Sequence, residues 1–130
     1  MMDNKNQRYI RLFPSGAIRS DNRGRERYDW ISPLALKELA QYLSTTENSF
    51  ASDNYYKGIT TEACVESMMR HLNDYRIDGN KKEAVGALFN ALALVHTIVL
   101  KERGEYIEHR KETVYMSEEE YKDKLSRAEV

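Results

Sequence analysis

The stretch from Asn80 to Gly104 constrains the fold most, because it predicts one long and largely apolar helix. Alanine, leucine and valine recur in it at helical spacing, from Ala84 to Val99. Asn80 suits the capping position before such a helix, and Gly104 suits the position after its end. The apolar run ALFNALALVHTIVL is interrupted by polar residues, so the sequence predicts a buried helix rather than a membrane span.

A second helix is expected just before this one, across a tight turn at Asp78 and Gly79. It opens at Thr60 or Thr61, which are both suitable capping residues. Four apolar residues recur along it at helical spacing and are expected to form its core-facing stripe: Val65, Met68, Met69 and Leu72.

Two further helices complete the predicted bundle. Ser32 followed by Pro33 is a helix start, and apolar residues at helical spacing carry that helix to about Thr46. Ser117 with Glu120 has the spacing of a capping box and predicts a last, highly charged helix. The predicted fold is therefore all-α, a small bundle of about four helices.

The first thirty residues predict an irregular arm, because they carry proline, glycines and many charges. Only RYIRLF is strand-like, which allows one short hairpin. The predicted organisation is an irregular N-terminal arm over residues 1–31, a helical nucleotide-binding core over 32–107 and a charged C-terminal helix over 108–130.

The overall charge excludes binding to nucleic acid or membrane through a general electrostatic field. Twenty basic and twenty-one acidic residues leave a formal charge of −1, so DNA and membrane partners are not expected. The single cysteine, Cys64, cannot close an intrachain disulfide and is expected to pack as a small apolar residue. This composition fits a reducing, cytoplasmic setting.

Three carboxylates flank the turn between the two central helices. Glu62 and Glu66 are four residues apart and share a helix face with Arg70, so they either chelate an ion together or leave Glu66 paired with Arg70. Glu83 either faces these two across the turn or closes a capping box with Asn80.

Several polar and aromatic residues nearby also allow two interpretations. Lys81 and Lys82 oppose the macrodipole at a helix start, which an anionic ligand would explain, although chance surface lysines are an equal alternative. His71 is expected to be a structural, hydrogen-bonded histidine. The amide of Asn90 either contacts a ligand or ties two helices together. Four aromatic residues could stack on a base or simply pack: Trp30, Phe50, Tyr55 and Tyr56.

Five short motifs occur in a characteristic order: SGAIR, GRERYDWISPLAL, NYYKG, ESMMRHL and ALFNALALVHT. In this order they resemble the phage dATP/dGTP diphosphohydrolases, relatives of the MazG-like all-α nucleoside triphosphate pyrophosphohydrolases. The likeness covers roughly Ser15 to Ile107. It implies a helical homo-oligomer, a dimer or tetramer, in the cytoplasm of an infected bacterium. It also implies carboxylate-bound magnesium that helps to release pyrophosphate. The matching positions are Gly16, Arg19, Arg27, Asp29, Asn54, Gly58, Arg70, His71 and Asn90.

The chain departs from the family pattern where the metal site is expected. The start of the long helix normally reads acidic, acidic, histidine, and here it reads Lys81, Lys82 and Glu83. The middle loop has Ser49 and Phe50 in place of lysine and tyrosine. Because lysines repel a metal ion but can hold phosphates, we expect a shift from a metal cage toward a phosphate-binding site.

The leading hypothesis is therefore a phage-type protein that binds and sequesters a nucleotide, such as a cyclic nucleotide or cyclic ADP-ribose type host-defence signal. The alternatives are a magnesium-dependent dATP/dGTP diphosphohydrolase, with Glu62, Glu66 and Glu83 as metal ligands, and a purely structural helical protein. The predicted ligand contacts are Arg19, Arg27, Asp29, Trp30, Asn54, Tyr55, Lys57, Arg70, His71, Lys81, Lys82 and Asn90.

Overall fold

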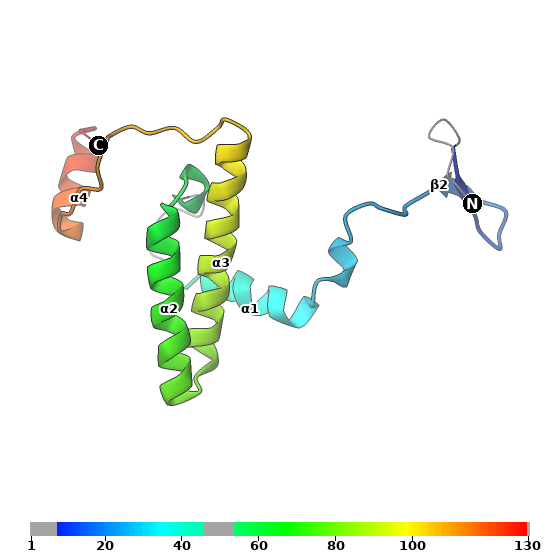
Figure 1. Cartoon of the computed structure of the whole chain (residues 1–130), viewed down its shortest axis with the longest axis horizontal. Coiled ribbons are helices and arrows are strands. Elements are labelled where there is room, and N and C mark those ends of the chain that lie inside the picture. Colours follow the sequence, from blue (N-terminus) through cyan, green and yellow to red (C-terminus); the bar gives the residue numbers. More distant parts are fainter. Residues whose placement is uncertain (1–7, 46–53, 130) are drawn as a thin grey trace. The chain divides into compact units, whose positions relative to one another are not determined.

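A computed structural model describes residues 8–45 and 54–129 of the chain (Figure 1). The chain divides into two compact units, Met1–Glu38 and Leu39–Val130. Four α-helices and one short hairpin of two strands make up its regular structure within the described residues. The prediction of a small all-α bundle with a hairpin in the N-terminal arm is confirmed. Ser49 and Phe50, which the sequence singled out, lie outside the described residues.

The N-terminal unit is built on a two-stranded antiparallel hairpin. Strand β1 spans Ile10–Leu12, inside the RYIRLF stretch, and β2 spans Ile18–Ser20. Gly16 has a φ of +92° in the connecting turn, a conformation that favours glycine. A single 3₁₀ turn, η1, follows at Tyr28–Trp30.

Helix α1 spans Pro33–Leu43 and crosses the boundary between the two units. The Ser32 hydroxyl accepts a hydrogen bond from the Ala35 N–H at 3.2 Å, which confirms the predicted helix start. The helix ends three residues before the predicted Thr46. The hydroxyls of Ser44 and Thr45 donate to the Gln41 and Tyr42 carbonyls, and thereby satisfy two of the carbonyl groups at the helix end.

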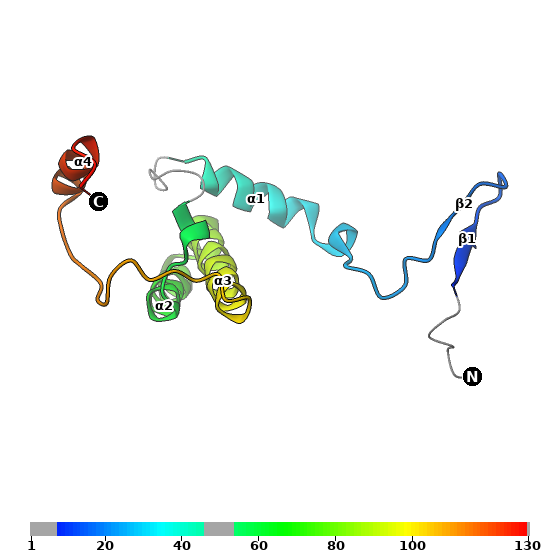
Figure 2. The same cartoon turned by 90° about the horizontal axis from the view of Figure 1, so that it is seen from above.

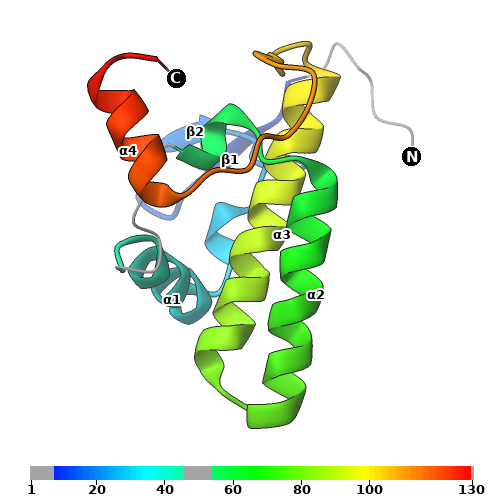
Figure 3. The same cartoon turned by 90° about the vertical axis from the view of Figure 1, so that its left-hand side faces the viewer.

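The second unit is centred on a hairpin of two long helices. Helix α2 spans Thr61–Asp78 and α3 spans Lys81–Glu102, and the two lie side by side along their lengths (Figures 2 and 3). The predicted caps form: the Thr60 side chain accepts from the Ala63 N–H, and the Asn80 side chain accepts from the Lys82 N–H. Gly79 ends α2 in the left-handed conformation, at a φ of +65°.

Two shorter elements belong to the same unit. The 3₁₀ helix η3, Asn54–Lys57, packs on α3. Helix α4 spans Glu118–Ser126, and the Ser117 hydroxyl accepts from the Glu120 N–H at 3.0 Å, as the capping prediction requires.

The interface between α2 and α3 is formed by small and polar residues. On α2 the fully buried residue is Cys64, and on α3 the buried positions are Gly86, Ala87, Asn90, Ala93 and Thr97. Small side chains let the two backbones approach closely, so large apolar residues are not needed to fill the interface.

The predicted core stripe of α2 is wrong for three of its four members. Met68 is half-buried, but Val65, Met69 and Leu72 are 42, 65 and 47% exposed. The physical reason is that α3 presents a narrow face of small residues, which accepts Cys64 and excludes the bulkier side chains. Most of the apolar stripe is therefore exposed to solvent in a single chain.

Helix α3 is long and apolar enough to cross a membrane by length and composition alone. The core helix of a soluble protein passes the same test, and α3 has buried residues, Asn90 and Thr97 among them, along the face toward α2.

Burial of Cys64 gives a direct test of this hairpin. The thiol is fully buried and its Sγ lies 3.8 Å from the Ile59 carbonyl oxygen, and burial raises the pKa of the thiol. Because the thiolate is the reactive form, we expect alkylation by iodoacetamide at pH 8 to be slow in the folded protein and fast in urea. Equal rates in the two conditions would contradict the burial of this side chain.

Candidate functional site

The candidate site lies where α2 ends and α3 begins. Gly79 turns the chain, its N–H donating to the Tyr75 carbonyl at 2.7 Å, and the side-chain oxygen of Asn80 accepts from the Lys82 N–H at 2.9 Å. These caps place Lys81 and Lys82 in the first, exposed turn of α3. Positive charge thus gathers at the positive end of the helix macrodipole, an arrangement that an anionic ligand would relieve.

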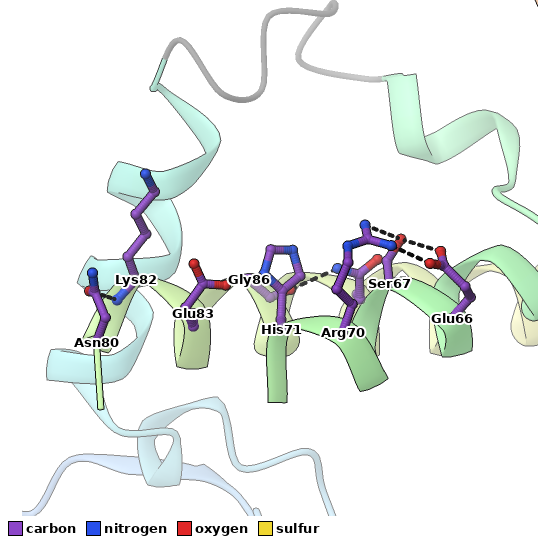
Figure 4. Close-up of polar contacts among 9 residues, drawn as sticks. Glu66, Ser67, Arg70, His71, Asn80, Lys82, Glu83 and Gly86 are labelled. Atoms are coloured by element: carbon purple, nitrogen blue, oxygen red, sulfur yellow. Dashed lines mark hydrogen bonds and ion pairs between the residues drawn. The ribbon is translucent and has the colours of Figure 1, made fainter. Parts of the chain in front are cut away.

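Glu66 is engaged by a cation on its own helix. The Arg70 guanidinium donates to the Glu66 carboxylate and to the Ser67 hydroxyl, the latter at 3.4 Å (Figure 4). Ser67 also donates to Glu66, at 3.3 Å. Of the two alternatives drawn from the sequence, the structure shows the ion pair. Glu62 lies one turn earlier on α2 and is exposed.

Glu83 is engaged by His71 across the helix interface. Its Oε2 atom lies 2.7 Å from His71 Nδ1, and both side chains are largely buried, at 22 and 25% exposure. An ionised carboxylate accepts hydrogen bonds and cannot donate them, so His71 Nδ1 is the donor to the ionised form of Glu83. Neither predicted role of Glu83, facing Glu62 and Glu66 or closing a capping box, is the contact observed. The expected structural role of His71 is the one that its geometry supports.

Gly86, on α3, lies directly against the His71 ring. A Cβ atom at Gly86 would lie 2.8 Å from both Cε1 and Nδ1 of His71. The glycine therefore makes room for the ring, and α2 and α3 meet there without space for another carbon. Figure 4 shows His71, Glu83 and Gly86 together, with the paired Glu66 and Arg70 farther along α2.

A magnesium ion, which the resemblance implies, does not fit the carboxylates of one chain. Two of the three predicted ligands already contact a protein side chain, Glu66 that of Arg70 and Glu83 that of His71. Among residues 8–45 and 54–129, no three His, Cys, Asp or Glu side chains converge on a position that could hold a metal. Because magnesium prefers carboxylate oxygens without competing cations, this arrangement disfavours it.

Asn90 lies inside the helix interface and bonds to its own helix. Its side-chain nitrogen donates to the Gly86 carbonyl at 2.8 Å, and the residue is 8% exposed. This bond stays within α3, so the amide is not seen to tie two helices together, which was the structural alternative. The ligand role of Asn90 stays a prediction.

Tyr55 packs within an aromatic cluster of the second unit. Its ring lies edge-on to Phe89 and to His96, each with centroids 5.6 Å apart, and 4.7 Å from the ring of Tyr56. Burial raises the pKa of the Tyr55 phenol. In this arrangement the ring packs between protein side chains, while Asn54 and Lys57 lie at the two ends of the same 3₁₀ helix.

Two residues that the sequence analysis did not assign hold this cluster in place. His96 Nε2 lies 3.1 Å from the Tyr56 carbonyl oxygen, and the Thr97 hydroxyl donates to the Ile59 carbonyl at 2.7 Å. Both side chains pin the segment before α2 onto α3. The sequence did carry a signal, because His96 and Thr97 are two of the three polar residues that interrupt the long apolar run.

The N-terminal unit carries the other predicted contacts. Arg27 binds both carboxylate oxygens of Asp29, at 3.0 and 2.6 Å, and lies 4.1 Å from the centre of the Trp30 ring. The Arg27 side chain lowers the pKa of the Asp29 carboxyl, and Asp29 raises the pKa of the guanidinium. Trp30 is 74% exposed, and Arg19 lies on β2.

The fold and the candidate site define a small helical protein whose central hairpin carries lysines at one end and paired carboxylates along its side. The chain belongs to the family described as dATP/dGTP diphosphohydrolase, N-terminal, which it matches over residues 15–110. The suspected family is thereby confirmed. No curated protein and no solved structure matches the chain.

Proposed function

We propose that this chain binds a phosphate-bearing nucleotide at the start of α3 and retains it without cleaving it. Lys81 and Lys82 follow the capping residue Asn80 directly, where backbone N–H groups at a helix start also favour anions. The description of the family names dATP and dGTP, so a purine deoxynucleoside triphosphate is the first ligand to test.

The observation that carries the retention proposal is the state of the carboxylates. Arg70 forms an ion pair with Glu66, and His71 contacts Glu83 in the helix interface, so these two carboxylates already have protein partners. In hydrolysis a metal neutralises phosphates and activates water, so a site in which protein side chains engage two of the three carboxylates loses rate more than it loses nucleotide affinity. A cyclic nucleotide or cyclic ADP-ribose type host-defence signal would suit the same cations, and its retention would make the protein an anti-defence sponge.

A second candidate function is diphosphohydrolysis of dATP or dGTP, which the description of the family favours. It requires the Glu66 and Glu83 carboxylates to exchange their present partners for magnesium. Mg²⁺ is then the cofactor that the protein needs, and Glu62 is the third ligand.

We also propose that the chain forms a homo-oligomer, a dimer or a tetramer. Four residues of α3 repeat at steps of four, three and four and are 36 to 57% exposed: Leu88, Leu92, Val95 and Val99. This is the spacing of two helices packed against each other along a seam. With the exposed α2 stripe, these residues suit a second copy of the same hairpin. Sedimentation equilibrium tests this, because a monomer at micromolar concentration would contradict it.

Glu66→Gln separates the two candidate functions. On the retention proposal the wild-type protein shows no magnesium-dependent turnover of dATP, and the variant binds dATP as tightly as the wild type, because Glu66 holds Arg70 rather than a metal. On the hydrolysis proposal the wild type releases pyrophosphate and the variant loses this activity. Glu102→Gln, at the opposite end of α3, is the matched control and should behave as wild type in both assays.

A further inference from the structure

The N-terminal hairpin carries an unusual pair of arginines. In its register Arg11 pairs directly with Arg19, whereas Ile10 pairs with Ser20 and Leu12 with Ile18. Because side chains alternate along a strand, the two arginines share one face of the hairpin and the three apolar residues share the other. Like charges placed directly opposite each other destabilise a strand pair, and a bound anion would relieve this repulsion.

The carboxylate nearest in sequence to these arginines is already engaged. The Asp21 carboxylate accepts from the Arg23 backbone N–H at 3.0 Å and from Arg23 Nε at 3.1 and 2.9 Å. These bonds, that from the backbone first, lower the pKa of the Asp21 carboxyl. The Arg23 guanidinium also lies 4.9 Å from the centre of the Tyr9 ring. Asp21 and Arg23 therefore form an ion pair with each other, and Asp21 does not balance the charge of the other hairpin arginines.

The remaining arginines make only neutral contacts, or none that the structure shows among the described residues. Arg11 Nε donates to the Ser20 carbonyl at 3.0 Å, and Arg25 Nη2 lies 3.5 Å from the Ser20 hydroxyl. The side chains of Arg8 and Arg19 make no hydrogen bond or ion pair within the described part of the chain. Two guanidinium groups, those of Arg11 and Arg25, therefore contact Ser20, and Arg19 precedes it in the sequence. None of these three arginines forms an ion pair with a carboxylate among the described residues.

A hollow of about 570 Å³ runs along the same strands. Three arginines line it, together with apolar and aromatic residues, Ser20 and the Asp21 that is paired with Arg23: Arg8, Tyr9, Ile10, Ile18, Arg19, Ser20, Asp21 and Arg25. This volume is in the range of sites for small ligands. Several guanidinium groups beside apolar and aromatic surface suit a ligand with a chain of phosphates and a flat apolar part.

We propose that this hairpin binds a chain of phosphates through Arg8, Arg11, Arg19 and Arg25. The inference rests on the proposed function for the identity of the ligand as a nucleotide, and it extends that function by giving the N-terminal unit its own phosphate contacts. Of the four residues, Arg19 and Arg25 lie within the family motifs, and only Arg19 is among the matching positions. Guanidinium groups bind phosphate oxygens in bidentate fashion, so several of them on one short hairpin favour a polyphosphate over a single carboxylate.

The test uses the full chain, with tripolyphosphate, dATP and a single-stranded oligonucleotide as separate probes in titration calorimetry. Arg11→Ala combined with Arg19→Ala, and separately Arg8→Ala with Arg25→Ala, are each expected to weaken binding about tenfold or more. Arg23→Ala is the matched control, because that arginine is closed on Asp21, and it should bind as wild type. Circular dichroism checks that each variant keeps the helical content of the wild type.

The outcomes separate this inference from the function on which it rests. Loss of tripolyphosphate and dATP binding in both arginine pairs, with Arg23→Ala unaffected, supports the hairpin site. Tighter binding of the oligonucleotide, lost in the same variants, also supports the site and assigns its phosphates to a nucleic-acid backbone. Unchanged dATP affinity in both pairs overturns the hairpin site while the proposed nucleotide binding stands. Binding of tripolyphosphate that depends on the hairpin, without any nucleotide binding, supports the site and overturns the proposed function.

Discussion

Gly86→Ala is expected to destabilise the protein by about 1 to 3 kcal/mol, the usual effect of overpacking a close contact. A glycine-to-alanine substitution inside a helix ordinarily stabilises a protein, because glycine there costs about 0.5 to 1 kcal/mol relative to alanine. The expected effect at Gly86 therefore has the opposite sign. The added Cβ would lie 2.8 Å from two atoms of the His71 ring, which cannot swing away without losing its bond to Glu83. Urea unfolding, followed by circular dichroism, measures the change in the free energy of unfolding.

The control is the same substitution without the histidine ring. In a His71→Ala background, Gly86→Ala should stabilise the protein by the ordinary helical preference of about 0.5 to 1 kcal/mol. The difference between the two backgrounds isolates the contact in a double-mutant cycle. Stabilisation by Gly86→Ala in both backgrounds would show that α2 and α3 do not approach each other in this way.

Charge reversal at the start of α3 is expected to have the largest effect on ligand binding. Lys81→Glu combined with Lys82→Glu should weaken nucleotide binding about a hundredfold or more, because two charge-assisted contacts to phosphate are replaced by repulsion. Acidic residues at a helix start are favoured by the macrodipole, so the melting temperature should hold or rise slightly. Titration calorimetry measures the affinity, and the melting temperature excludes unfolding as the cause of its loss.

A matched control for this variant reverses two lysines elsewhere in the same unit. Lys101→Glu with Lys111→Glu gives the same net charge, and both positions lie far along the sequence from the start of α3. If this control weakens binding as much as the Lys81 and Lys82 pair does, the effect comes from overall charge and the proposed site is wrong.

The helix boundaries could be predicted because they depend on neighbours in the sequence. Thr60, Asn80 and Ser117 cap the helices as expected, since a capping bond joins residues only two or three positions apart. The burial of each helix face depends on residues distant in the sequence, and there the prediction was wrong for Val65, Met69 and Leu72. The apolar spacing on α2 marks a face to be covered, but the face that meets α3 contains Cys64 and His71.

The candidate site shows the same division between local and distant contacts. The pairing of Glu66 with Arg70 was one of two alternatives, because residues four apart on a helix are neighbours. The pairing of His71 with Glu83 could not be predicted, since it depends on how α2 and α3 are aligned across the turn. That alignment follows from the room that Gly86 leaves, and the sequence analysis gave this glycine no role.

The central claim is that the protein holds a nucleotide without cleaving it. The most direct measurement incubates the protein with magnesium and a panel of deoxynucleoside triphosphates and cyclic nucleotides, removes free ligand by filtration, and denatures the protein. Chromatography then identifies what was retained. Our account predicts intact nucleotide recovered from the denatured wild-type protein and none from the Lys81→Glu, Lys82→Glu variant. Monophosphate and pyrophosphate in the filtrate would contradict it and would assign this chain the activity in the description of its family.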